Sequence, residues 1–420
     1  MNRLKKILRA VGPGFITGAS DDDPSGILTY AQTGAQFGYK QLWVSLFSLP
    51  FMISIQEMCG RIGIVTGKGL ASVIRMHYGR KLLSVAIALL FVANTVNIGA
   101  DLGAMAASAE LVSGLPFLFW LLAMSIVTLV LVIVIPYPIY ARVLKWLTLS
   151  LFAYVVTVFL VKQDWSAVAY GTFVPHIEFN AQFLMNIVAL FGTTISPYLF
   201  FWQADEEVEE EVERGQLKEM GVGTPKFKAR DITNMRWDTA LGMIFSNLVA
   251  FFVILTAAST LHANGIFTIE TAADGARALE PIAGSLASTL FALGIIGTGM
   301  LAVPVLAGSA AYAVSESLQW KEGLSKKWSQ AKGFYLVIIL STLIGVAVNF
   351  SNVPPFRMLY ASAVLNGVTA PVLMVFIILI ANNKKIMGKH RNTPISNILG
   401  WMIAAFMGLC AVAMLGQMVM

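Results

Sequence analysis

Long apolar stretches separated by short polar segments run along this chain of 420 residues. An α-helix needs about 20 consecutive apolar residues to cross a bilayer. The pattern therefore predicts an all-α, polytopic membrane protein with about eleven transmembrane helices. The predicted spans are 11–36, 41–60, 83–112, 117–139, 143–162, 181–202, 238–262, 283–318, 333–349, 356–381 and 397–418.

The first and the sixth stretch each contain a helix-breaking cluster. Residues 21–26 read Asp-Asp-Asp-Pro-Ser-Gly, and residues 192–197 read Gly-Thr-Thr-Ile-Ser-Pro. A helix broken within lipid leaves backbone groups unsatisfied, so such breaks are tolerated where they line a cavity or bind something. Two breaks in corresponding positions of two halves indicate the binding site of a secondary transporter that is built from inverted repeats.

Eleven spans divide into five, five and one. A repeat of five helices has odd parity, so a second copy must run inverted through the membrane. We therefore expect a first repeat at 1–180, a second repeat at 181–382 with an acidic cytoplasmic loop at 203–236, and a linker with the last helix at 383–420.

Composition and charge fix the orientation of these helices. The chain is 57% hydrophobic and only 12% charged. Of its 29 Lys and Arg residues, 25 fall in alternate connecting segments, which places the N-terminus in the cytoplasm. The formal net charge of +6 is thus a consequence of topology. We expect a multi-pass protein of the plasma membrane, surrounded by lipid, with no nucleic-acid partner.

The first break offers hard oxygen ligands to a cation. Pro24 lacks an amide donor and disfavours helical geometry at Asp23, while Gly26 lets the chain turn freely. The freed carbonyls beside the Asp23 carboxylate suit Mg²⁺, which keeps much of its hydration shell. Asp21 and Asp22 add negative charge nearby, and they bind the cation through water or face an aqueous vestibule.

The second break also presents oxygen. Pro197 releases carbonyls, and Thr193, Thr194 and Ser196 carry hydroxyl groups. Taken alone, this cluster is equally compatible with a proline kink whose Thr and Ser side chains bond back to the helix. Neither cluster contains His, Cys or Met, which soft or borderline metals usually recruit. An all-oxygen site favours Mg²⁺, Ca²⁺ or Mn²⁺.

Three further polar features lie along the chain. Asp101, in the third span, is a proton relay, a guide for the cation or a structural carboxylate. Asn366, in the tenth span, could offer an oxygen to the cavity, although we prefer a hydrogen bond between helices. The acidic run at 205–213 is either a cytosolic cation sensor or a solvated helical extension that pairs with the basic residues after it, and we favour the solvated extension.

Several segments resemble the Nramp divalent-metal transporters. They are Gly-Pro-Gly-Phe at 12–15, Asp-Pro at 23–24, Gly-Ala-Gln-Phe-Gly-Tyr at 34–39, Arg-Ile-Gly-Ile-Val-Thr-Gly-Lys at 61–68 and Trp-Asp at 237–238. The resemblance implies the LeuT-like fold of the amino-acid/sodium symporters, a 5+5 inverted repeat with unwound helices 1 and 6. It also implies alternating access around a metal site between those two helices.

The chain departs from the family at the metal site itself. The Asn of the family's Asp-Pro-Gly-Asn motif is replaced by Gly26, and Met-Pro-His in helix 6 is replaced by Ser196-Pro197-Tyr198. The family's carbonyl ligand falls on Thr193. The resemblance thus implies metal ligands at Asp23, Gly26, Thr193 and Ser196. It implies a surrounding shell or pathway that includes Asp21, Asp22, Thr194, Tyr198, Asp101 and Asn366.

These departures match the Nramp-related magnesium transporters, because sulfur, amide and proton-linked His are all lost. That resemblance implies import of partly hydrated Mg²⁺, with Mn²⁺ also accepted and no proton coupling. We expect a monomer with no cofactor and no enzymatic activity, since no nucleophile–base pair and no HExxH zinc motif occurs. The alternatives are a proton-coupled Mn²⁺/Fe²⁺ symporter and, ranked lower, a sodium-coupled amino-acid transporter of the same fold.

Overall fold

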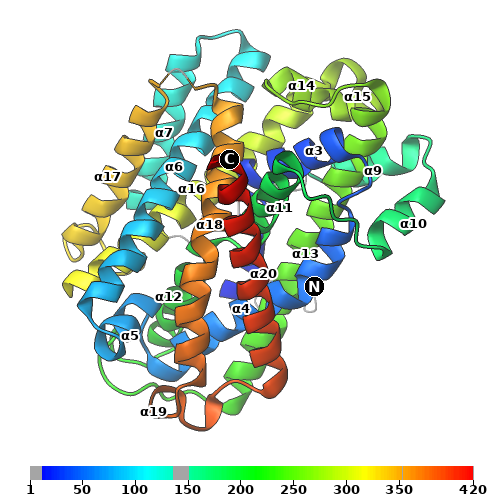
Figure 1. Cartoon of the computed structure of the whole chain (residues 1–420). Helices are drawn as coiled ribbons and strands as arrows, with labels where there is room; N and C mark the ends of the chain where they lie inside the picture. The colour runs from blue at the N-terminus through cyan, green and yellow to red at the C-terminus, as the bar shows by residue number, and fades with distance from the viewer. Residues whose placement is uncertain (1–11, 136–150, 352, 420) are drawn as a thin grey trace, which may run out of the picture.

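A computed structural model describes residues 12–135, 151–351 and 353–419 of the chain, which fold into α-helices joined by turns and by longer loops such as 214–228 and 319–331 (Figure 1). The longer helices are α2 (Pro13–Asp21), α3 (Pro24–Phe37), α4 (Trp43–Thr66), α6 (Arg80–Ser113), α7 (Phe117–Val134), α9 (Phe152–Leu160), α11 (Ala181–Thr194), α12 (Pro197–Glu213), α13 (Ala229–Thr260), α16 (Ala287–Leu318), α17 (Lys332–Val348), α18 (Pro355–Asn382) and α20 (Pro394–Val419). Short helices complete the connections: α5 (Leu70–His77), α10 (Trp165–Phe173), α14 (Ala272–Ala276), α15 (Glu280–Ala283) and α19 (Lys384–Met387).

Each of the eleven predicted spans contains helix in the described residues. Seven helical stretches are long and apolar enough to cross a bilayer: α6, α7, α11 with α12, α13, α16, α18 and α20. The other four spans fall on α2 with α3, on α4, on α9 and on α17. Of these, α2 and α3 are separated by the first break, and α17 has only 17 residues. Residues 143–150 of the fifth span lie outside the described residues.

Close helix packing is made possible by glycine. A Cβ atom on Gly18 would lie 2.2 Å from the carbonyl carbon of Gly242, so α2 and α13 touch backbone to backbone. A Cβ atom on Gly192 would lie 2.3 Å from the amide nitrogen of Gly367, so α11 and α18 also touch backbone to backbone. Small residues allow this approach in membranes, where van der Waals contact drives helix association. The two broken helices are thereby held against α13 and α18.

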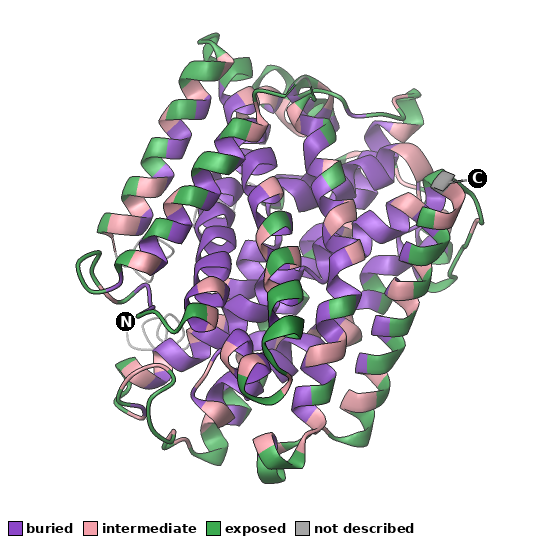
Figure 2. Cartoon of the chain, turned by 60° about the vertical axis from the view of Figure 1, so that its left-hand side comes forward, coloured by how far each residue is buried: buried purple, intermediate pink, exposed green. Residues whose placement is uncertain are grey.

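The outer helices expose part of their surface to the surroundings (Figure 2), and many of the exposed residues are large and apolar. On α7, Phe119, Ile126 and Val134 are exposed, and on α20 so are Leu409 and Val412. In water such faces would be unfavourable, whereas lipid solvates them at no cost. The exposed apolar belt therefore fits the expected lipid environment.

The acidic run at 205–213 differs from our expectation. It forms the end of α12, and Asp205, Glu207, Glu209 and Glu211 are all buried. The one ion pair that α12 carboxylates form within the described residues joins Glu210 to Arg214, at 2.6 Å. The interpretation as a solvated extension paired with its basic half is therefore wrong, because tertiary packing of α12 against α4 and α16 encloses these side chains.

The glycine contact between α2 and α13 gives a first prediction. Gly18→Ala places a methyl group against the Gly242 backbone, and this overpacking should destabilise the protein by about 1–3 kcal/mol. We expect a lower midpoint of thermal unfolding, measured as loss of the monodisperse peak in size-exclusion chromatography. Gly408→Ala is the control, because the nearest atom to its new Cβ is Pro371 Cβ at 3.9 Å. Equal midpoints for the two variants would contradict the prediction.

Candidate functional site

The first break separates α2 from α3 at Asp22 and Asp23. Asp23 is the N-cap of α3, with extended backbone, and Pro24 takes the first helical position, where its missing amide hydrogen is no loss. The Asp23 Oδ1 atom accepts hydrogen bonds from the Gly26 amide at 2.6 Å and from the Ser25 hydroxyl at 2.7 Å. The Asp23 carboxylate is thus rigidly oriented by the start of its own helix.

The other oxygen of this carboxylate faces α6. Asp23 Oδ2 accepts a hydrogen bond from Asn97 Nδ2 at 2.8 Å, and Asn97 Oδ1 accepts one from Ser362 Oγ of α18 at 2.7 Å. All three side chains are buried. The sequence analysis did not single out Asn97 or Ser362. The available signal was an amide inside an apolar span, one helical turn before Asp101 and therefore on the same face.

The second break separates α11 from α12 at Ile195 and Ser196. Ser196 Oγ donates to the carbonyls of Gly192 and Thr193 at 3.1 and 2.8 Å, and Thr194 Oγ1 donates to the Leu190 carbonyl at 2.8 Å. These bonds follow the back-bonding alternative that the sequence left open. Thr193 differs from both, since its buried hydroxyl oxygen forms no hydrogen bond of normal geometry within the described residues.

The two breaks meet at Gly26. A Cβ atom on Gly26 would lie 2.9 Å from Thr193 Oγ1, 3.3 Å from the Asp21 carbonyl oxygen and 3.3 Å from Asp23 Oδ1. Oxygens from helix 1 and helix 6 therefore lie within 3.3 Å of the Cβ position that Gly26 leaves empty. A carboxylate, a carbonyl and a hydroxyl are hard ligands of the kind that Mg²⁺, Ca²⁺ and Mn²⁺ accept.

The aspartate triplet does not act as one cluster. Asp21 Oδ2 and Asp22 Oδ1 both lie near the Ser246 hydroxyl of α13, at 2.8 and 3.2 Å, whereas Asp23 turns to α6. The remaining carboxylate oxygens, Asp21 Oδ1 and Asp22 Oδ2, are buried without a hydrogen bond in the described part of the chain. Across those same residues, no three His, Cys, Asp or Glu side chains converge on a common metal position.

Three other predicted residues lie around the breaks or on neighbouring helices. Tyr198 links the two broken helices, because its hydroxyl donates to the Ser20 carbonyl at 2.9 Å. Asp101 is fully buried near Asp23 and the Ser25 amide, yet neither of its oxygens forms a normal hydrogen bond to the residues described. Asn366 is also buried, and neither atom of its amide is paired within the described ranges. The helix–helix hydrogen bond that we preferred for Asn366 is thus not formed.

A cavity of mixed polar and apolar lining lies on the outer side of the first break. It has a volume of about 290 Å³ and is lined by residues of α3, α11, α18 and the loop at 268–269. Gln32, Gln36 and Gln182 supply amide groups, and the lining reaches down to Leu28, two residues beyond Gly26. The charged side chain of this lining is that of Arg357, which pairs with Glu270 at 2.7 Å.

Comparison with known proteins agrees with this architecture. The family model described as natural resistance-associated macrophage protein-like (Nramp) matches residues 14–417. The divalent metal cation transporter MntH of Caldanaerobacter subterraneus subsp. tengcongensis is 25% identical over 420 residues, covering 96% of this chain and 91% of that protein. MntH of Klebsiella pneumoniae strain 342 is 25% identical over 402 residues, covering 95% of this chain and 91% of the relative.

Solved structures show the same fold at lower sequence identity. The Eremococcus coleocola manganese transporter, in complex with an aromatic bis-isothiourea compound, superposes with a TM-score of 0.79 at 17% identity, covering 99% of this chain and 88% of that one. MhsT in complex with L-phenylalanine gives a TM-score of 0.60 at 13% identity, covering 97% of each chain. The predicted LeuT-like fold and the multi-pass membrane location are thereby confirmed. With its family model matched over nearly the whole length, this chain belongs to the Nramp family of integral membrane proteins.

Proposed function

We propose that this protein is a secondary transporter that imports divalent cations across the cell membrane, with Mg²⁺ as its main substrate and Mn²⁺ also accepted. Divalent metal transport is the activity named for its MntH relatives. The observation that carries the choice of Mg²⁺ is the group of hard oxygens around Gly26, with no sulfur or imidazole in either break.

The proposed ligand positions are Asp23, Gly26, Thr193 and Ser196. Asp23 supplies the charge, and its oxygens keep free lone pairs beyond the bonds that orient them. Thr193 offers a buried hydroxyl oxygen that forms no hydrogen bond of normal geometry with the described residues. Gly26 leaves room for water on the ion, which suits a cation that dehydrates reluctantly. Asp21, Asp22 and Asp101 add negative charge around the site.

We further propose transport without proton coupling, driven by the membrane potential. A divalent ion gains about 4.6 kcal/mol from an inside-negative potential of about 100 mV. The position of the family's His holds Tyr198, whose hydroxyl is bonded to the Ser20 carbonyl. We also propose repeat boundaries at 1–180, 181–382 and 383–420, and a monomer that needs no cofactor and catalyses no reaction.

Two alternatives are distinguishable from this proposal. A proton-coupled Mn²⁺/Fe²⁺ symporter is favoured by one observation, the buried Asp101, whose carboxylate forms no hydrogen bond of normal geometry with the described residues. A sodium-coupled amino-acid transporter would place a substrate carboxylate at a half-helix N-terminus. Here the N-terminus of α3 is already capped by the Asp23 carboxylate, which would repel that group.

The test is uptake of metal into proteoliposomes that contain a pH-sensitive dye. We expect Mg²⁺ to enter without any change in lumenal pH, and Mn²⁺ to compete with it. Empty liposomes and a proton ionophore calibrate the leak and the dye. Exclusion of Mg²⁺ together with acidification during Mn²⁺ entry would overturn the proposal in favour of the symporter.

A further inference from the structure

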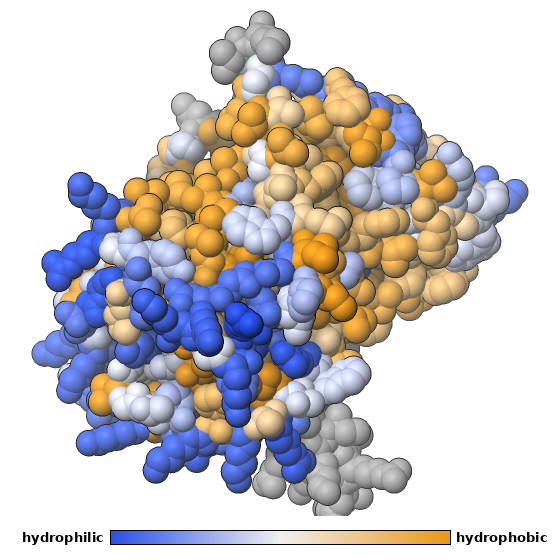
Figure 3. Space-filling view, turned by 60° about the horizontal axis from the view of Figure 1, so that its bottom comes forward, coloured by the Kyte–Doolittle hydropathy of each residue, from blue (hydrophilic) through white to orange (hydrophobic). Residues whose placement is uncertain are grey.

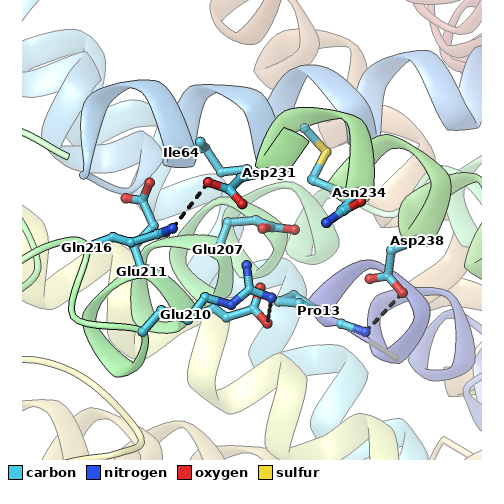
Figure 4. Close-up of a pocket in the computed structure, with 12 residues that line it drawn as sticks. Pro13, Ile64, Glu207, Glu210, Glu211, Gln216, Asp231, Asn234 and Asp238 are labelled. Atoms are coloured by element: carbon cyan, nitrogen blue, oxygen red, sulfur yellow. Dashed lines mark hydrogen bonds and ion pairs between the residues drawn. The ribbon is translucent and has the colours of Figure 1, made fainter. Parts of the chain in front are cut away.

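A second group of carboxylates lies at the cytoplasmic end of the molecule, far along α12 from the second break. The cytoplasmic face, turned forward in Figure 3, is rich in hydrophilic side chains. Here a cavity of about 40 Å³ is lined by the start of α2, the end of α12, the beginning of α13, Ile64 of α4 and Gln216 (Figure 4). Its charged lining residues are Glu207, Glu210, Glu211, Arg214, Asp231 and Asp238. Five carboxylates thus face a single guanidinium group.

Four of these carboxylates have partners that fix their positions. Glu210 pairs with Arg214 at 2.6 Å, and Glu207 accepts from Gln203 Nε2 at 2.8 Å. The other two of the four, Asp231 and Asp238, lie on α13. Asp231 accepts from the Lys228 amide at 2.8 Å and from Gln216 Nε2 at 3.2 Å, and Asp238 accepts from the Gly12 and Phe15 amides at 3.0 and 3.1 Å. The neutral donors orient the carboxylates without cancelling their charge.

Glu211 is the exception. Its side chain lines the cavity and is only 3% exposed, yet neither carboxylate oxygen has a hydrogen-bond partner in the described residues. The neighbouring Gln216 Oε1, which also belongs to the lining, is unpaired as well. Burial of an unpaired carboxylate is costly, and repulsion from the other carboxylates adds to that cost. A positive charge in the cavity would remove both penalties.

The chemistry of the lining points to a hydrated divalent cation. Among the described lining residues there is no His, Cys or Lys, and the carboxylate and amide oxygens, which suit hard ions, outnumber the single sulfur, that of Met235. The carboxylates of the described chain stand too far apart for three of them to ligate one bare ion. Mg²⁺ typically keeps several waters and contacts only one or two carboxylates. A cavity of this volume holds more than a single water.

We propose that this cavity is a cytoplasmic Mg²⁺ site, separate from the broken helices, in which Glu211 contacts the ion and Glu207 and Asp231 bind it through water. The site bridges α12 and α13 beside the start of α2. Asp238 already ties α2 to α13 through two amides. A bound ion would hold these helices together and oppose opening at the cytoplasmic end. Slower import at high cytoplasmic Mg²⁺ follows from this, a consequence that rests on the proposed function.

Binding is tested by counting ions on the full-length protein in lipid nanodiscs. Bound Mn²⁺ is measured by electron paramagnetic resonance and displaced by Mg²⁺. With Asp23→Ala disabling the central site, we expect one ion to remain. Adding Glu211→Gln should weaken its binding at least tenfold. Adding Glu213→Gln is the matched control, because Glu213 is exposed on the same helix, and it should leave the ion in place.

Three outcomes would overturn the cytoplasmic site. The first is that Asp23→Ala alone abolishes all Mn²⁺ binding. The second is that Glu211→Gln leaves the affinity for the remaining ion unchanged, and the third is that Glu213→Gln lowers this affinity as much as Glu211→Gln does. Glu207→Gln serves as a second variant if Glu211→Gln does not elute as a monodisperse protein. It should weaken binding of the ion several-fold. If Asp23→Ala instead keeps two ions and Glu211→Gln removes one, the central assignment fails while the cytoplasmic site is supported.

The regulatory consequence is tested separately in vesicles of a single protein orientation. Mg²⁺ on the cytoplasmic side should slow Mn²⁺ entry in the wild type and in Glu213→Gln. It should slow entry several-fold less in Glu211→Gln. Equal inhibition of all three would contradict a regulatory role for the cavity, because back-flux through the central site affects them alike.

Discussion

Asp23→Asn is expected to abolish Mg²⁺ uptake while leaving the protein folded. Asparagine caps a helix about as well as aspartate, so the bonds from the Gly26 amide and the Ser25 hydroxyl have a substitute acceptor. The amide nitrogen of the asparagine would face Asn97 Nδ2, which is also a donor, so we expect the Asn97 bond to be lost and the unfolding midpoint to fall modestly while the protein stays folded. The negative charge is lost, and we expect uptake to fall by more than about 100-fold, beyond what loss of a residue supporting a metal ligand costs.

The control separates the two roles of this side chain. Asp164 caps α10 through the Ser166 and Ala167 amides, both at 3.1 Å, and it lies far from the breaks on an exposed loop. Asp164→Ala should cost about 1 kcal/mol of stability and leave uptake unchanged. If Asp23→Asn transports like the wild type, the Asp23 carboxylate is only a helix cap, and the proposed ligand set is wrong.

The helix breaks were predictable because they depend on local chemistry. Pro24 and Pro197 each take the first position of a new helix, as the residue type demands. The positions of the breaks therefore follow from a few adjacent residues in the sequence. The fold class follows from the length and order of the apolar stretches, which need no knowledge of contacts.

The partners of the break residues could not be predicted in this way. Asn97 and Ser246 approach the aspartates from 74 or more positions away in the chain, and Ser362 reaches Asp23 only through Asn97. A Ser or Asn in an apolar span has no sequence signature that tells a partner of the site from an ordinary helix contact. Only the crossing of α6, α13 and α18 over the first break decides which of them takes part.

The acidic run shows a second limit. A series of Glu residues in a connecting loop favours a solvated helix when composition alone is considered. In the structure α12 extends to Glu213, and its packing buries the carboxylates of Glu207, Glu209 and Glu211 while Glu213 stays exposed. Burial was set by the neighbours of the helix, which the local sequence does not encode.

Gly26→Asn is expected to shift the ion preference of the central site from Mg²⁺ toward Mn²⁺. The new Cβ would lie 2.9 Å from Thr193 Oγ1, so the hydroxyl must rotate away and the space for water on the ion shrinks. Mg²⁺ gives up water reluctantly, whereas Mn²⁺ binds more tightly to oxygen and nitrogen ligands generally. Mg²⁺ uptake should fall at least about tenfold, while Mn²⁺ uptake falls much less. The measurement is parallel uptake of both ions in proteoliposomes, reported as the ratio of their rates.

Gly26→Ala distinguishes the ligand from the steric effect in this experiment. Alanine brings the same Cβ atom into contact with Thr193 but supplies no amide oxygen. Gly26→Ala should therefore slow the uptake of both ions and should not favour Mn²⁺ uptake over Mg²⁺ uptake. A rate ratio that shifts toward Mn²⁺ only in Gly26→Asn would mean that the amide ligates the ion and replaces its water. If both variants reduce the uptake of Mg²⁺ and of Mn²⁺ by the same factor, then the volume at Gly26 does not set the selectivity. In that case the preference for Mg²⁺ must come from the oxygens of Asp23 and Thr193 alone.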